Sequence, residues 1–186
     1  MAESSLSSEG ARRAPGVGLP PSPNWYISCL GSLGADGRLF AYAAHNLVVV
    51  TEVEAQRIAC VLPGHSNRVT AVCFAGYAAG GGADAACAWV VSSAADRSVR
   101  LWRLEAGGGE GDGRGGEAGW RGSCQRVVRN LGAPVSAMAA VPSGSPRTAW
   151  LGDSRGDLLA WQLGAEGKPQ RLCALGAPVF SLAALA

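Results

Sequence analysis

The chain carries little charge and has no long apolar run. Of its 186 residues only 16% are charged, and the formal net charge is +2. This balance does not by itself indicate a nucleic-acid surface, which would have to be a local basic patch. No segment reaches the length of a transmembrane helix, and the first residues lack the apolar core of a signal peptide. These absences predict an intracellular protein with no membrane partner.

The cysteines form no pattern typical of a metal site. None of the six belongs to a CxxC pair, and the only histidines that could join them as ligands are His45 and His65. We therefore expect no metal and no cofactor. The spacing also does not resemble a secreted disulfide framework. We interpret Cys60 and Cys73 as small buried apolar residues, because both lie in apolar, strand-like segments.

Two segments have compositions that disfavour packed structure. Residues 1–18 are polar, small and rich in glycine and proline, so we expect a disordered N-terminal tail. Residues 105–122 are rich in glycine and free of large aliphatic side chains, which predicts a disordered insertion. Trp120 is isolated inside this insertion, and we expect it to pack on a neighbouring surface.

The remaining chain has short β-rich runs separated by turn residues, and no long helical period. The sequence therefore predicts an all-β protein. Four runs precede Gly64, at 25–30, 38–44, 47–53 and 57–62. Further runs repeat the plan, which divides the chain into four-stranded units at 24–63, 64–131 and 132–176, with 177–186 beginning a fourth.

One stretch of the second unit resembles a WD repeat. It starts at Gly64-His65 in GHSNRVTAVCF and ends at Trp102 in WVVSSAADRSVRLW. This order of a Gly-His pair, β-rich segments, a turn with Asp96 and a strand that ends in tryptophan is typical of a propeller blade. The resemblance predicts an incomplete WD-repeat β-propeller over residues 19–186. It also implies a hydrogen-bonded line through the blade, whose candidates are His65, Ser92, Asp96 and Trp102.

An enzymatic interpretation of the same residues is disfavoured. Ser92, His65 and Asp96 are the residue types of a hydrolase triad, but no GxSxG elbow surrounds the serine. The sequence predicts a ring that binds macromolecular partners, with no small-molecule substrate. The third unit departs from the pattern, because it has Gly132-Ala133 in place of Gly-His. We therefore expect the hydrogen-bonded line to be less complete there.

Three blades and one strand do not close a propeller ring. An open ring leaves apolar faces and sheet edges exposed. The sequence therefore predicts that residues 1–186 are part of a longer polypeptide.

A more specific resemblance begins just before the first blade. The string LPPSPNWY, followed by RLFAYAAHNLVVV and SSAADRSVRLW, is similar to the N-terminal region of the Gem-associated protein 5 family. The resemblance covers residues 19–186. It implies two stacked seven-bladed propellers that bind small nuclear RNA at its Sm site and 5′ cap. It also implies other proteins of the survival-of-motor-neuron (SMN) complex as partners, and a location in the cytoplasm, nucleoplasm and gems.

The same resemblance implies an RNA-contacting segment at Asn24, Trp25 and Tyr26, and His45 stands where the family can carry an arginine. Single-stranded RNA is bound by stacking unpaired bases on aromatic rings, so the residue types suit the chemistry. Two alternatives remain open. Trp25 and Tyr26 could instead pack the first strand into its blade. The protein could also be a WD-repeat scaffold that binds proteins and no RNA.

Overall fold

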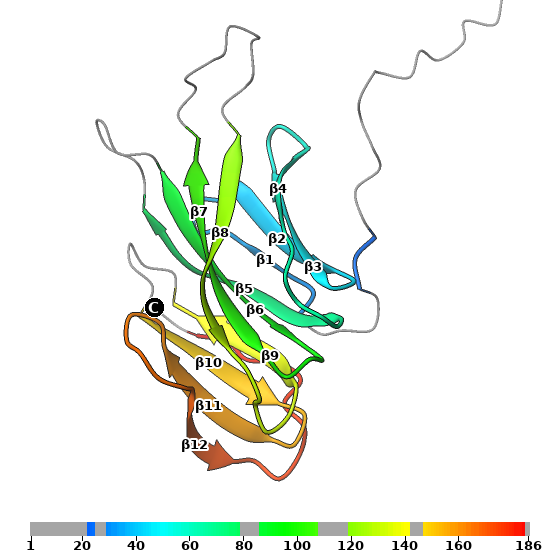
Figure 1. Ribbon diagram of the computed structural model, residues 1–186, viewed down its shortest axis with the longest axis vertical. Coiled ribbons are helices and arrows are strands. Elements are labelled where there is room, and N and C mark those ends of the chain that lie inside the picture. The colour runs from blue at the N-terminus through cyan, green and yellow to red at the C-terminus, as the bar shows by residue number, and fades with distance from the viewer. Residues whose placement is uncertain (1–21, 25–28, 79–85, 108–118, 142–146, 185–186) are drawn as a thin grey trace, which may run out of the picture.

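The described part of the protein consists of β-strands and turns. A computed structural model describes residues 22–24, 29–78, 86–107, 119–141 and 147–184. Its strands form three antiparallel sheets of four strands each, in the orders β1-β2-β3-β4, β5-β6-β7-β8 and β12-β11-β10-β9. The sheets follow one another as blades (Figure 1). The fold is therefore all-β and is an incomplete WD-repeat propeller, as the sequence predicts. No helix in the described residues could cross a membrane.

Blade one contains the apolar runs LFAYAA and LVVVTE as its central hairpin. β2 and β3 pair without a bulge from Leu39↔Glu52 to Ala44↔Leu47. The hairpin closes at His45, whose backbone is left-handed with φ 52°. The four strands are β1 Gly31–Leu33, β2 Leu39–Ala44, β3 Leu47–Glu52 and β4 Arg57–Leu62.

Blade two has longer strands than the sequence predicts. Strand β8 begins at Trp120, which pairs with Ala106 of β7, and Gly107 N–H donates to Gly119 O at 2.7 Å. The predicted insertion at 105–122 is therefore too wide at both ends, because backbone pairing continues where large side chains are scarce. Residues 108–118 lie outside the described residues. The strands are β5 Val69–Ala78, β6 Cys87–Ala94, β7 Val99–Ala106 and β8 Trp120–Val128.

Blade three repeats the plan and is followed by a segment that lies along its inner edge. No strand is assigned between β12 and residue 184. However, Val179 N–H donates to Asp153 O at 3.2 Å, and Ser136 Oγ donates to Val179 O at 2.6 Å. Val179 is itself buried. The strands of the blade are β9 Val135–Ala140, β10 Thr148–Asp153, β11 Asp157–Gln162 and β12 Gln170–Ala174.

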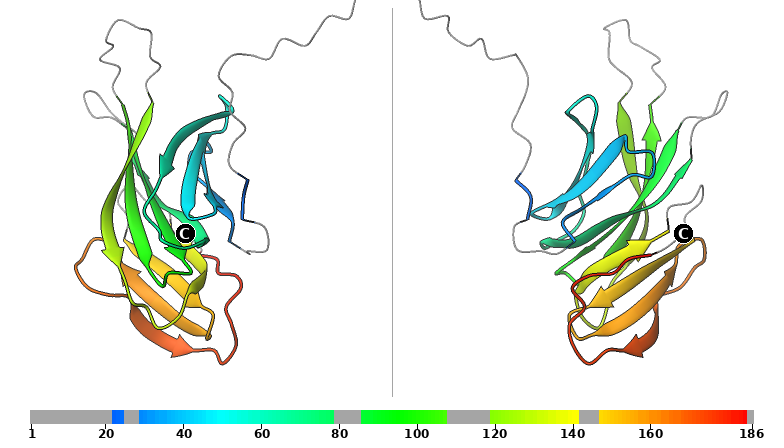
Figure 2. Two further views of the ribbon diagram at one scale, coloured as in Figure 1. Left: turned by 45° about the vertical axis from the view of Figure 1, so that its right-hand side comes forward. Right: turned by 180° about the vertical axis from the view of Figure 1, so that it is seen from behind.

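The core lies between the blades, because each sheet buries its faces against its neighbours. One apolar cluster joins blades one and two and contains Trp102. A second cluster joins blades two and three and contains Trp161. The three sheets lie closest together at their inner strands and diverge toward their outer strands (Figure 2). The side chains left outside include several large hydrophobics on blade one and after β11: Leu33, Phe40, Ile58, Leu172, Leu175 and Phe180.

The cysteines are free thiols and take no part in bridges. Cys73 is buried in the second cluster, and burial raises the pKa of its thiol to about 12. Cys60 is partly buried, and burial raises its pKa to about 11. Among the described residues, no group of three His, Cys, Asp or Glu side chains could hold a metal ion.

Candidate functional site

A buried hydrogen-bonded line runs through blade two and joins the four predicted residues. The indole Nε1–H of Trp102 donates to Ser92 Oγ at 2.8 Å. The same hydroxyl lies 2.8 Å from His65 Nε2. On the other side of the imidazole, Nδ1 lies 3.3 Å from Asp96 Oδ2 and 3.1 Å from Ser98 Oγ. The line therefore connects the strands β6 and β7 with the loop before β5.

The partners of His65 fix where its proton lies. Ser98 Oγ donates to Asp96 Oδ1 at 2.6 Å, so both groups near Nδ1 act as acceptors toward the ring. The proton therefore sits on Nδ1, and Ser92 O–H donates to the bare Nε2. Burial lowers the pKa of His65, and this effect outweighs the opposing attraction of Asp96. The imidazole is thus neutral near pH 7.

Asp96 is held as a carboxylate. Burial raises the pKa of Asp96, but hydrogen bonds from the Ser98 side chain and the Ser66 and Ser98 amides, together with His65, bring it down to about 2. The Ser66 amide donates to Oδ2 at 2.9 Å and the Ser98 amide to Oδ1 at 2.9 Å. The carboxylate thereby ties the loop before β5 to the β6–β7 turn. Since Ser92 is fully buried and His65 is only 2% exposed, the line is placed to stabilise the blade.

Within the described residues of blade three there is no corresponding hydrogen-bonded line. Trp161 pairs with Ala149 as Trp102 pairs with Val90, so Leu151 stands at the position of Ser92. Counted back from the start of the inner strand, Leu131 takes the position of His65, so the predicted alignment of Ala133 with His65 was wrong by two residues. Trp161 Nε1 is buried and has no hydrogen-bond partner among the residues that the structure describes. An apolar pair has therefore replaced the serine and histidine, and it leaves the indole donor unsatisfied, which costs about 1–3 kcal/mol.

Asn24 is buried, and its side chain forms hydrogen bonds to both blade one and blade two. Its side-chain Nδ2 donates to His45 O at 2.9 Å and to Val69 O at 3.0 Å. Its Oδ1 accepts the His45 amide at 2.6 Å. Its own amide donates to Ala43 O at 2.9 Å. These bonds occupy the side-chain amide, so Asn24 fixes the chain against the β2–β3 turn and the start of β5.

The other predicted RNA-contacting residues are placed differently. Trp25 and Tyr26 lie outside the described residues. His45 is exposed at the tip of the β2–β3 turn, and its carbonyl also accepts the Val69 amide at 2.7 Å. The structure therefore brings Asn24 and His45 together. Burial of the asparagine had no signal in the sequence, because Asn occurs equally in exposed turns.

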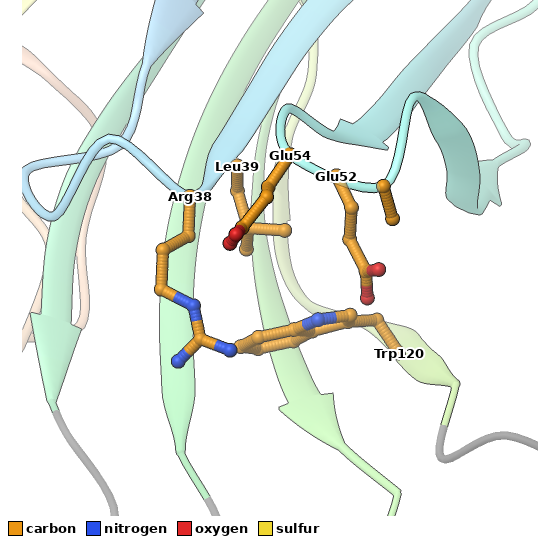
Figure 3. A pocket seen from close by; sticks show the side chains of 6 residues that line it. Arg38, Leu39, Glu52, Glu54 and Trp120 are labelled. Atoms are coloured by element: carbon orange, nitrogen blue, oxygen red, sulfur yellow. The ribbon is translucent and has the colours of Figure 1, made fainter.

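A pocket that the sequence did not indicate lies between blades one and two, at the turn that follows β3 and the start of β8. It has a volume of about 170 Å³. Figure 3 shows the indole of Trp120 as its floor, with the carboxylates of Glu52 and Glu54 and the guanidinium of Arg38 around it. Arg57 Nε lies 2.7 Å from Glu52 Oε2 and compensates that carboxylate. The pocket therefore offers an aromatic face with mixed charge and no net preference for one sign.

Comparison with known proteins gives two partial similarities. No family model matches the chain. It is 26% identical over 88 residues, 47% of its length, to "Component of gems protein 5" of Dictyostelium discoideum. It is 38% identical over 71 residues, 38% of its length, to "U3 small nucleolar RNA-associated protein 21" of Saccharomyces cerevisiae. The chain spans only 7% of the length of each relative. Together with the three blades, these similarities support a WD-repeat scaffold.

Proposed function

We propose that the chain is part of an RNA-binding WD-repeat subunit of the SMN complex. In this proposal it recognises the Sm site of small nuclear RNA during assembly of spliceosomal ribonucleoproteins. Its partners are small nuclear RNA and other SMN-complex proteins, in the cytoplasm and nucleus. The observation that carries the proposal is the similarity to "Component of gems protein 5", together with the string LPPSPNWY ahead of blade one.

The geometry around Asn24 supports this proposal. The side chain of Asn24 is hydrogen-bonded to the β2–β3 turn and to the start of β5. The two aromatic residues that follow directly are Trp25 and Tyr26. Aromatic rings are suited to stack the unpaired bases of single-stranded RNA. In this proposal Asn24, Trp25, Tyr26 and His45 all take part in RNA binding.

The test is RNA binding by the full chain. We would measure the affinity for a short single-stranded RNA with a uridine-rich Sm-type site, using Trp25→Ala and Tyr26→Ala. Each base stack contributes about 1–3 kcal/mol, so each variant should weaken binding by about 5- to 150-fold. Phe180→Ala is the matched control, because Phe180 is 65% exposed and lies beside blade three. Unchanged affinity in both variants would contradict the proposal and favour a scaffold that binds only proteins.

A further inference from the structure

Exposed arginines gather on the loops at one end of blades two and three. These loops are linked by backbone hydrogen bonds: Ala95 N–H donates to Arg68 O, Leu131 N–H to Arg97 O and Ser154 N–H to Pro134 O. The turns β6–β7 and β10–β11 lie at the same end of their sheets (Figure 1). The exposed arginine side chains on these loops are Arg68, Arg97, Arg129 and Arg155. Among the described residues, none of these four forms an ion pair.

The acidic residues of the same end are held by hydrogen bonds or by an ion pair. Asp96 accepts hydrogen bonds from Ser66 and Ser98. Asp153 is buried and accepts the amides of Arg155 and Asp157 at 2.9 Å. Asp157 Oδ1 lies 2.7 Å from Arg171. The four exposed arginines outnumber the carboxylates of Asp96 and Asp153, so this end carries a net positive charge, although the net charge of the whole chain is only +2.

A recess opens within this basic end. Its volume is about 240 Å³, and it lies between the loop before β5, the β6–β7 turn and the residues after β8. Arg100 reaches into it from β7. The guanidinium of Arg100 is fixed by a 2.5 Å hydrogen bond from Nη2 to Gly64 O, while its Nε is buried and finds no partner in the described part of the chain. Arg129 lines the opposite side, next to Asn130. The Asp96 carboxylate also lines the recess, where its oxygens accept hydrogen bonds from Ser66 and Ser98. Two guanidinium groups and one carboxylate therefore flank the recess, so its lining carries a net positive charge.

We propose that this end of blades two and three binds the phosphate backbone of single-stranded RNA, and that the recess between Arg100 and Arg129 holds one phosphate group. Guanidinium groups pair with phosphate through two parallel N–H donors, which is why arginine suits this role. The surface adjoins the other predicted contacts, because His45 O accepts the amide of Val69, the residue after Arg68. A strand of RNA that stacks near His45 can thus continue across Arg68 to Arg129.

The inference rests on the proposed RNA-binding function and adds a measurable property to it. Each phosphate contact on a single strand adds about 0.7 to the slope of log affinity against log salt concentration. In the double variant Arg68→Gln/Arg129→Gln, the slope should fall by about 1.4. The probe is the uridine-rich RNA used above, and the protein is the full chain. Both side chains are exposed, so the variant should unfold at the same urea concentration as the wild type.

The control is Arg121→Gln/Arg147→Gln, which removes the same charge from exposed arginines at the opposite end of the sheets. Its slope should match that of the wild type. An unchanged slope in Arg68→Gln/Arg129→Gln, or an equal fall in both double variants, overturns the inference. If Trp25→Ala still weakens binding in that case, the proposed function stands without this surface. If the wild type binds no RNA, both fail; binding of polyglutamate in its place would identify an acidic protein ligand.

Discussion

Replacing Ser92 with alanine tests the buried line of blade two. The hydroxyl accepts the indole proton of Trp102 and donates to Nε2 of His65, each at 2.8 Å. Ser92→Ala leaves the backbone and the neighbouring apolar contacts in place. It removes both hydrogen bonds at once, and neither partner can reach water, because His65 and Trp102 are both 2% exposed.

The expected loss follows from these two orphaned groups. A buried polar group without its partner costs about 1–3 kcal/mol, so Ser92→Ala should lower the free energy of unfolding by about 2–5 kcal/mol. Equilibrium urea unfolding followed by tryptophan fluorescence measures this change. Ser154→Ala is the control, since Ser154 is exposed in the matching turn of blade three and should change stability by less than about 0.5 kcal/mol.

A double-mutant cycle separates the two hydrogen bonds. Trp102→Phe removes the indole donor, so a following Ser92→Ala orphans only His65 and should cost about 1–2 kcal/mol less than in the wild type. If Ser92→Ala costs less than about 0.5 kcal/mol, or if its cost is the same in both backgrounds, the hydroxyl does not connect the two rings and the reasoning fails.

Two further predictions concern titration and thiol reactivity. The folded-state pKa of His65 lies below its ordinary value of 6.5, so the unfolded chain binds the proton more readily. The resulting stability is present above about pH 6.5 and is lost as the pH falls, so urea midpoints should decrease from pH 7.5 to 5.5; a flat or rising profile would contradict a neutral buried imidazole. Asp96, with a pKa near 2 against an ordinary 3.8, should add a second loss only below about pH 4. In labelling with N-ethylmaleimide, exposed Cys124 should react in the native protein and Cys73 only after unfolding, because burial raises the Cys73 pKa to about 12. Equal labelling rates for the two thiols would show that the core between blades two and three is open.

The sequence predicts β2, β3 and β4 of blade one well because a blade is a local unit, but β1 lies at Gly31–Leu33, after the run predicted at 25–30. Arg57–Leu62 is found at its predicted bounds, since alternation and turn residues define a short strand without help from distant contacts. The start of strand β8 falls inside the insertion predicted at 105–122. Its residues from Trp120 onward are held by pairing with β7, a tertiary effect that glycine-rich composition conceals.

The candidate site could be predicted from the sequence only in part. The spacing of His65, Ser92, Asp96 and Trp102 follows a repeat pattern, so their hydrogen bonds could be anticipated. The burial of Asn24 could not, because its partners are backbone groups 21 and 45 residues away. The arginine surface could not be predicted from the sequence either, since its residues are far apart in the chain. They come together only because backbone hydrogen bonds link their loops.

The most direct test of the account is ultraviolet cross-linking of the full chain to the uridine-rich RNA, followed by mass spectrometry of the linked peptides. The account predicts a cross-link within the peptide that contains Trp25 and Tyr26, and the link should disappear when excess unlabelled RNA of the same sequence competes. Cross-links confined to other peptides, or none above the level of a polyadenosine control, would contradict the claim that this segment binds RNA.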